Sequence, residues 1–222
     1  MPYSKQFKKP RRNKKQKPAK SKMGKLSQRI TALSNRLPAL ESHVIDINSF
    51  ATSVSTSASA NYPMIQIAQG STAANRKGDT VVLKNSTLNL AVTKGDANNV
   101  VRLILAATPS DTHLQLSDVL QYANTTSHSN LPFASPYKTQ PTTSEQTYEI
   151  LFDKVYNLTE EINMIVDKVK ISYGKKGKRV NFNSASSSAP ENYKLSLMYI
   201  SDSSAGAHPN IHYSFRTRFV DV

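Results

Sequence analysis

The residues best suited to chemistry are the Lys and Arg side chains gathered in the first 36 positions of the chain. Thirteen of the 29 basic residues lie there, and none of the 15 acidic residues does. The remaining positions combine the other 16 basic residues with all 15 acids, so nearly all of the net charge of +14 belongs to this segment. A polycation of this kind binds phosphates and releases their counterions, which predicts a nucleic-acid-binding arm. The predicted binding residues are Lys5, Lys8, Lys9, Arg11, Arg12, Lys14, Lys15, Lys17, Lys20, Lys22, Lys25, Arg29 and Arg36.

The composition of residues 1–22 also predicts how this arm behaves without a partner. The segment consists mainly of Lys, Arg, Pro, Gln and Ser, with Tyr3 and Phe7 as its only aromatic residues. It cannot bury enough apolar surface to offset the entropy of ordering, so we expect it to be disordered when unbound. A nuclear-import signal and a solvated tail without a partner are the alternatives. Binding through phosphates should be independent of base sequence and strongly dependent on salt.

Catalytic and metal-binding patterns are weak by comparison. The chain has no Cys, which excludes a disulfide framework, a thiolate nucleophile and a Cys-ligated zinc site. It has no nucleophile-elbow or phosphate-loop motif, and we do not expect its five His residues to bind a metal. Asp79, Asp96 and Asp111 lie at expected turns and are candidate calcium ligands between subunits, although turn carboxylates usually bond the local backbone. We therefore expect no enzyme and no cofactor, with interface calcium as the alternative.

The element that connects the arm to the body is a predicted helix over residues 23–37. Pro38 ends it, and a helix of this length is not stable alone in water. Its apolar stripe must therefore pack against a partner. One possibility is a bundle of helices from several subunits beneath a symmetry axis, with the basic faces of the helices toward nucleic acid. The alternative is that the helix packs on its own domain. The domains expected are an arm at 1–22, a helix and connector at 23–42, and a shell-type domain at 43–222. The stripe consists of Met23, Leu26, Ile30, Leu33 and Leu37.

From residue 43 onward the apolar period changes to two, which is typical of β-strands. One short helix is expected at 116–123, and interrupted alternation at Ile165–Val166 predicts a bulge. No crossover helices separate the strands, so about 180 residues form one all-β sandwich or jelly roll. The expected strands cover residues 44–51, 64–68, 80–93, 99–107, 146–158, 161–173, 180–183, 193–200 and 211–220, with a loop at 52–60.

Two smaller basic features lie within the body. The turn at residues 174–179 adds four charges, and we interpret it either as a second phosphate contact or as a solvated hairpin. Arg216 and Arg218 share the polar side of the last expected strand. They are expected either to face nucleic acid or to form salt bridges with a neighbouring subunit.

The order of these elements resembles that of single-jelly-roll viral coat proteins, in which an arm and a short helix precede eight or nine strands. Examples of this family are the coat proteins of satellite tobacco necrosis virus and of circular single-stranded DNA viruses that encode a replication initiator. The longer arm and the loops at 52–60 and 124–145 depart from the pattern. The matching stretches are Ile67-Ala68-Gln69-Gly70, Arg76-x-Gly78-Asp79-x-Val81, Tyr148-Glu149-Ile150-Leu151, Asp153-x-Val155, Asp167-Lys168-Val169, Val180-Asn181-Phe182-Asn183 and Asp221-Val222.

The resemblance implies an eight-stranded antiparallel jelly roll that assembles with itself into a small icosahedral shell, with T=1 symmetry and about 60 copies. The arm would lie inside on a single-stranded viral genome, with DNA favoured and RNA as the alternative. The protein would then belong to the virion, and to the host nucleus for a DNA genome, with no membrane partner. A non-viral nucleic-acid-binding β-domain with a basic tail is the competing hypothesis.

Overall fold

The computed structural model describes residues 27, 42–56, 59–123, 131–139, 147–204 and 206–222. The predicted arm lies outside these residues. So does the predicted helix, except for Ser27, which has helical backbone. The chain divides after residue 39, and the fold described below is that of the second part.

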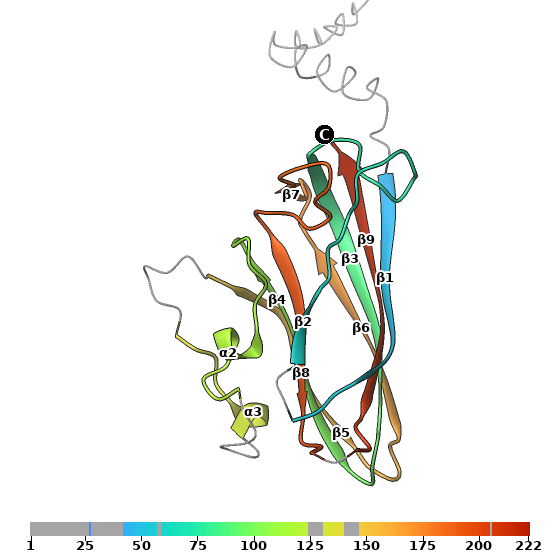
Figure 1. Cartoon of the computed structure of the whole chain (residues 1–222), viewed down its shortest axis with the longest axis vertical. Coiled ribbons are helices and arrows are strands. Elements are labelled where there is room, and N and C mark those ends of the chain that lie inside the picture. The colour runs from blue at the N-terminus through green and yellow to red at the C-terminus, as the bar shows by residue number, and fades with distance from the viewer. Residues whose placement is uncertain (1–26, 28–41, 57–58, 124–130, 140–146, 205) are drawn as a thin grey trace, which may run out of the picture. The chain divides into compact units, whose positions relative to one another are not determined.

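Two antiparallel sheets build this part of the chain (Figure 1). The first sheet has the order β1-β9-β3-β6, with the short β7 paired to β3, and the second has the order β2-β8-β4-β5. The strands are β1 Ser42–Ser53, β2 Ser59–Pro63, β3 Thr80–Thr93, β4 Asn99–Thr108, β5 Glu149–Leu158, β6 Met164–Ser172, β7 Lys178–Asn181, β8 Lys194–Ser201 and β9 Asn210–Asp221.

This strand order is that of a jelly roll. In the first sheet the last strand, β9, lies between β1 and β3, and in the second sheet β8 lies between β2 and β4. The chain therefore passes repeatedly from one sheet to the other, and strands from its two ends interleave, as in two linked Greek keys. Eight strands form the two layers, and the short β7 pairs with one end of β3. The predicted eight-stranded antiparallel jelly roll is therefore confirmed.

The main core lies between the two sheets. Strand β9 shows the pattern most clearly, because its inward side chains are buried while Arg216 and Arg218 on its other side are exposed. In β4 and β8 nearly every residue is buried. Their second side must therefore be covered as well, as the apolar run at 99–107 predicts.

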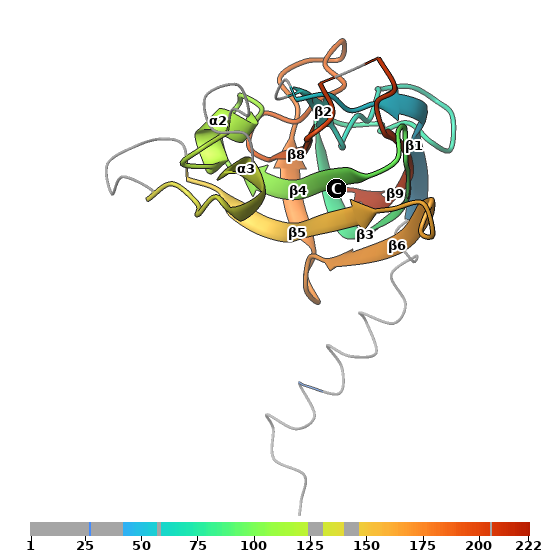
Figure 2. The same cartoon turned by 90° about the horizontal axis from the view of Figure 1, so that it is seen from below.

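The segment between β4 and β5 provides this cover. It contains the short helices α2, Leu116–Val119, and α3, Leu131–Ala134, which lie beside the second sheet and away from β9 and β1 (Figure 2). Helix α2 is shorter than the predicted helix at 116–123 because Leu120 has extended backbone and bridges to Tyr137. The buried cluster consists of Ile104, Ala106, Leu114, Leu116, Val119, Leu120, Met198 and Ile200.

The strand predicted at residues 64–68 is wrong. The strand in this region is β2, which precedes it and lies partly in the expected loop. Met64, Ile65 and Ile67 are buried, which explains the strand-like pattern. Their backbone N–H groups do not join one strand ladder, however. Met64 N–H donates to the carbonyl of Leu195 in β8, whereas Ile67 N–H donates to the carbonyl of Ser188 in a loop.

The bulge predicted at Ile165–Val166 is also wrong. Strand β6 pairs with β3 in unbroken register, from Met164 opposite Thr93 to Ser172 opposite Asn85. The alternation is interrupted in the sequence because Val166 is apolar and yet points outward, with 68% of its surface exposed.

Candidate nucleic-acid interface

The side of the first sheet turned away from the core carries an ordered array of cations, and we call this side the open face. Outward residues of paired strands form rows across a sheet, and successive rows lie about 7 Å apart, two residues along each strand. In the strand order β6-β3-β9-β1, three such rows are Ser172–Asn85–Arg218–Val44, Lys170–Thr87–Arg216–Asp46 and Lys168–Asn89–Ser214–Asn48.

These three rows, with the adjoining β6–β7 turn and β7, form what we call the basic half of the open face. Asp46 is the one carboxylate among the twelve residues of the three rows. The resulting surplus of positive charge suits phosphate groups, which Lys binds as a point charge and Arg can bind through two parallel hydrogen bonds. The exposed cations are Lys168, Lys170, Arg216 and Arg218 in the rows, Lys178 and Arg179 in β7, and Lys175 and Lys176 in the turn.

Arg216 is oriented by its neighbour across the strands. Its Nε and Nη2 donate hydrogen bonds of 2.7 and 2.8 Å to the two carboxylate oxygens of Asp46. The hydrogen bond from Arg216 holds the pKa of Asp46 below its ordinary value, so the carboxylate stays charged at neutral pH. Arg216 thus forms its salt bridge within the chain, whereas the sequence analysis considered a salt bridge with a neighbouring subunit. Arg218 forms no ion pair with another described residue.

The β6–β7 turn presents its lysines on a backbone that requires glycine. Gly174 and Gly177 have φ values of +75° and +80°, in the region that side chains disfavour. A Cβ at Gly177 would also lie 2.5 Å from the Leu83 carbonyl oxygen, so the turn packs closely on β3. Lys175 and Lys176 at the tip are exposed, which supports the phosphate-contact interpretation as well as the solvated one.

Strand β1 begins beside the basic half of the open face. Ser42, the first residue of β1, pairs with Val220 beyond the Arg218 row. The next residue, His43, is buried, donates from Nδ1 to the Ala73 carbonyl at 2.9 Å and stacks on Phe219. The chain therefore enters the sandwich at the basic end of the open face. The thirteen predicted arm residues lie outside the described residues, so their role stays a prediction.

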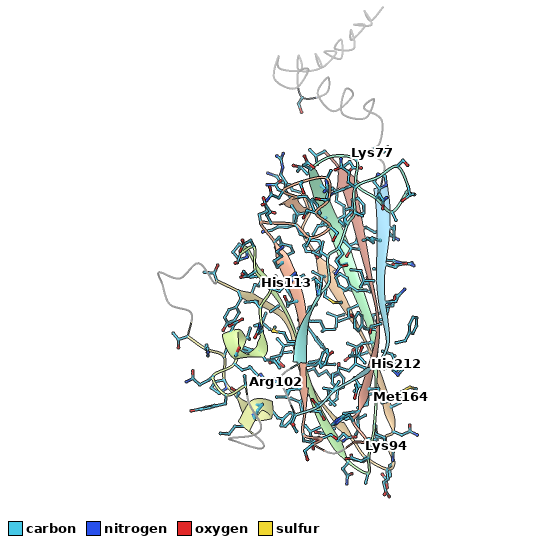
Figure 3. All side chains as sticks on the ribbon, in the orientation of Figure 1. Lys77, Lys94, Arg102, His113, Met164 and His212 are labelled. Carbon is cyan, nitrogen blue, oxygen red and sulfur yellow. The ribbon has the colours of Figure 1, made fainter. Side chains whose placement is uncertain are left out.

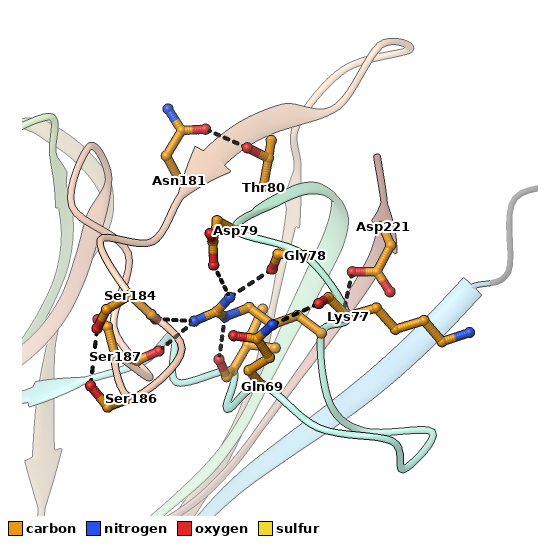
Figure 4. A network of polar contacts seen from close by, with 12 residues as sticks. Gln69, Lys77, Gly78, Asp79, Thr80, Asn181, Ser184, Ser186, Ser187 and Asp221 are labelled. Carbon is orange, nitrogen blue, oxygen red and sulfur yellow. Dashed lines mark hydrogen bonds and ion pairs between the residues drawn. The ribbon is translucent and has the colours of Figure 1, made fainter.

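A buried arginine holds the loops at this end of the sandwich (Figure 4). Arg76 is fully buried and its five N–H groups all have acceptors within 3.3 Å. Four of these acceptors are backbone carbonyls from two separate loops, and the fifth is Asp79. The acceptors are Ile67, Gly78, Asp79, Ser184 and Ser187.

The candidate calcium ligands are not brought together within one chain. Asp79 accepts from Arg76, and Asp96 accepts from the side chain of Asn99 at 2.6 Å. These two aspartates lie at opposite ends of β3, more than about 40 Å apart. Among the described residues no three His, Cys, Asp or Glu lie close enough to hold a metal ion. A calcium site shared between subunits stays a prediction.

His208 and His212 are four residues apart, a spacing that the sequence reasoning overlooked. On a helix such a pair could bind zinc, but His212 lies in β9 and His208 just before it. Each Nδ1 atom already has a neighbour, since His212 accepts from Ala51 N–H and His208 contacts the Ser203 hydroxyl.

Lys168 and Lys170 were not singled out by sequence reasoning. The signal that could have found them is the alternation Lys168-Val169-Lys170-Ile171, which places both lysines on one side of a strand. The sequence does not reveal the strand pairing, by which Lys170 and Arg216 lie in the same row on either side of Thr87.

The strand order thus defines a jelly-roll β-sandwich with a cationic open face. No protein-family model matches the sequence, and no curated protein does either. Among solved structures, a chain of Desmodium yellow mottle tymovirus is similar at 10% identity and a TM-score of 0.38, over 82% of this chain and 86% of that one. A chain of deformed wing virus carrying the GFP gene is similar at 10% identity and a TM-score of 0.29, over 77% of this chain and 74% of that one. Likenesses of this strength carry no argument about function.

No helix among the described residues is long and apolar enough to cross a membrane.

Proposed function

We propose that this chain is the subunit of a self-assembling viral shell that packages a single-stranded genome. The observation that carries the proposal is the separation of charge along the chain. The first 36 residues hold thirteen cations and no acid, while the remaining residues, which are nearly neutral, contain a complete jelly roll. Jelly rolls recur in capsid, lectin and cupin domains. Of these, a shell that encloses nucleic acid is the one that needs a polycationic arm on a neutral body.

The position of the basic half supports this function. Strand β1 begins at Ser42, next to the row that contains Val44 and Arg218, so the chain enters the sheet at the basic half. A single strand held by the arm can therefore continue across Arg218, Lys170 and Lys168. These contacts reach only phosphates, so they position the strand without reading its bases.

The amount of charge agrees with a small genome. About 60 copies in a closed T=1 shell bring about 780 arm charges inside. With one negative charge per nucleotide, partial neutralisation corresponds to a single strand of about 1–2 kb. We propose DNA, which the family resemblance favours, with RNA as the alternative. The site of action is then the virion, and the host nucleus during assembly of a DNA virus.

In this proposal the chain has three parts: the arm at 1–22, the helix and connector at 23–42, and the shell domain at 43–222. The helix would bury its apolar stripe against copies from neighbouring subunits, because each copy alone is too short to be stable. Its Lys25, Arg29 and Arg36 would then face the genome together with the arm.

The test is to delete residues 1–22 and measure protection of nucleic acid from nuclease, with electron microscopy of the same particles. We expect the full-length chain to form spheres about 20 nm across that protect nucleic acid. The deletion should leave folded subunits or shells that protect none. A matched control carries residues 1–22 in scrambled order, with the same charge, and should still package. Protection that survives the deletion would contradict the arm's role.

The second candidate is a non-viral nucleic-acid-binding β-domain with a basic tail. The basic half is the observation that favours this candidate, because an exposed cationic sheet can bind a nucleic-acid strand without assembly into a shell. Light scattering separates the two, because a binding module stays a monomer or dimer under conditions in which a shell subunit forms particles.

A further inference from the structure

The other end of the open face is apolar, and we call it the apolar half. The row beyond Lys168 consists of Val166, Ala91 and His212, and it ends at a bulge in β1 that carries Phe50. Met164 begins the following row, which continues through Thr93, Asn210 and Ser53, and Figure 3 shows Met164 and His212 toward the end of the sandwich away from Lys77. The exposed fractions of Phe50, Val166 and Met164 are 84%, 68% and 53%.

The bulge is strained and holds Phe50 outward. The register of β1 with β9 breaks between Ser49 and Thr52, so Phe50 and Ala51 have no partners in the ladder. Ala51 has a φ of +53°, in the left-handed region that residues other than glycine rarely adopt. Its N–H donates to His212 Nδ1 at 3.1 Å, which keeps the strained turn in place. Backbone strain of this kind is concentrated at functional sites.

A shallow hollow lies beside Phe50 on the same face. Its volume is about 290 Å³, and Phe50 itself forms part of its wall, together with residues of all four strands, among them Asn48, Ala91, Val166 and His212. The face therefore presents a projecting aromatic side chain and a hollow next to each other.

We propose that the apolar half is a contact between two copies of this chain related by a two-fold axis, with Phe50 of each copy seated in the hollow of the other. The inference deepens the proposed shell function and rests on it, since it names one of the contacts that the shell needs. A projection and a hollow on one face make that face complementary to itself, which is the condition for a two-fold interface.

The charge distribution favours a second copy in this orientation. All cations of the rows lie in the basic half, so two copies that met there would oppose like charges. A two-fold axis through the apolar half brings together rows that contain no Lys, Arg, Asp or Glu and turns the two basic halves away from each other. Both basic halves then remain free to bind phosphates.

The exposed apolar surface has the size that such a contact requires. Phe50, Val166, Met164 and the nearby Ile162, which is 49% exposed, leave on the order of 400 Å² of apolar side chain accessible in each copy. Two copies together with their polar rims approach the ~1,200 Å² at which specific interfaces begin. The composition also favours protein over nucleic acid, because bases stack on aromatic rings and three of these four side chains are aliphatic.

The first experiment compares the full-length wild type with Phe50→Glu by sedimentation velocity in 1 M salt, where the arm is screened. We expect wild-type dimers, and a dissociation constant at least tenfold higher for Phe50→Glu. The matched control is Val155→Glu, which puts the same charge at a 37% exposed apolar residue of the other sheet and should leave the dimer unchanged. Circular dichroism confirms that each variant is folded. Unchanged dimerisation of Phe50→Glu would overturn the proposal.

A second experiment does not depend on the Glu variant folding. The chain has no Cys, so single cysteines report only on introduced contacts. Residues 50 and 166 lie on the two outer strands of the four-strand order, too far apart for a disulfide within one chain. Oxidising a mixture of Phe50→Cys and Val166→Cys chains should give a cross-linked heterodimer, which Val166→Cys alone should not form. Absence of the cross-link from the mixture would overturn the proposal.

Two outcomes separate this inference from the proposed function. If Phe50→Glu still assembles into spheres that protect nucleic acid, the contact is wrong and the shell stands. If the wild type neither dimerises nor assembles, the shell itself is wrong. Loss of affinity for a 30-nucleotide single strand by Phe50→Glu, with dimerisation intact, would instead identify Phe50 as a base-stacking platform and overturn the protein contact.

Discussion

The guanidinium carbon of Arg76 lies 4.2 Å from the centre of the Phe182 ring, and all five of its N–H groups have acceptors. One buried side chain thus joins the loop that precedes β3 to the loop that follows β7. The charge is tolerated in the interior because every donor is satisfied and the aromatic face contributes a favourable cation–π contact.

Replacing Arg76 should therefore be strongly destabilising. Arg76→Met leaves four buried or partly buried carbonyls without their donor, and we expect the free energy of unfolding to fall by about 3 kcal/mol or more. Urea unfolding of the full chain measures the change. The control is Asp79→Asn, whose side chain is 65% exposed and whose loss of charge should cost less than about 1 kcal/mol. Equal effects of the two substitutions would contradict the role given to Arg76.

Arg102 should show the coupling expected of a buried ion pair. Its guanidinium donates to both oxygens of Asp153 at 3.0 and 2.6 Å and to the carbonyls of Pro132 and Ser135. Arg102→Met leaves the half-buried Asp153 without its cationic partner, and we expect a loss of about 3 kcal/mol. The double variant with Asp153→Leu should lose at least about 1 kcal/mol less than the sum of the single changes. Additive losses in the same unfolding experiment would show that the pair is not coupled.

Tyr137 provides an independent report on this pair. Burial and the hydrogen bond to Asp153 raise the pKa of the Tyr137 hydroxyl to about 12. Asp153→Asn removes the negative charge, so the tyrosine should ionise at lower pH than in the wild type. Ultraviolet absorbance followed against pH measures tyrosine ionisation in the wild type and in the variant. The part of the signal that is lost in Tyr137→Phe belongs to Tyr137. An unchanged titration would show that Asp153 does not act on Tyr137.

His113 should make stability dependent on pH in a direction that can be worked out. Burial, with a smaller effect of Lys194, holds the pKa of His113 below its ordinary value. The unfolded chain then binds the proton more tightly, so the contribution of His113 to stability is lost as the pH falls below about 6.5. We expect the free energy of unfolding of the wild type, relative to His113→Gln, to decrease between pH 7 and pH 5. A constant difference over this range would contradict the prediction.

The basic half should contribute to the salt dependence of nucleic-acid binding. For a short single strand, Lys170→Gln with Arg218→Gln should reduce the slope of log affinity against log salt by about 1.4, since each lost phosphate contact removes about 0.7. The matched control, Lys94→Gln with Lys138→Gln, removes the same charge outside the rows and should leave the slope unchanged. Equal slopes for the two double variants would show that position on the open face does not matter.

Charge partition and strand content could be read from the sequence because both depend on local composition and period. Thirteen cations in 36 residues need no fold to be recognised, and β9 alternates so regularly that its buried and exposed sides follow directly. The predictions failed at residues 64–68 because a run of apolar residues was interpreted as a strand, and at Val166 because an apolar residue on the outward side was interpreted as a slip in the alternation.

Only the tertiary structure decided which distant residues share a site. Lys170 and Arg216 lie in one row, and Arg216 pairs with Asp46, because β9 is inserted between β1 and β3 in a defined register. The Asp46–Arg216 pair joins residues 170 positions apart, and composition and period carry no information about such pairings. The same holds for Phe50, whose exposure follows from a bulge that β9 imposes on β1 and His212 stabilises. The sequence by itself thus determined the charge of the arm and the class of fold, and long-range strand pairing decided the open face.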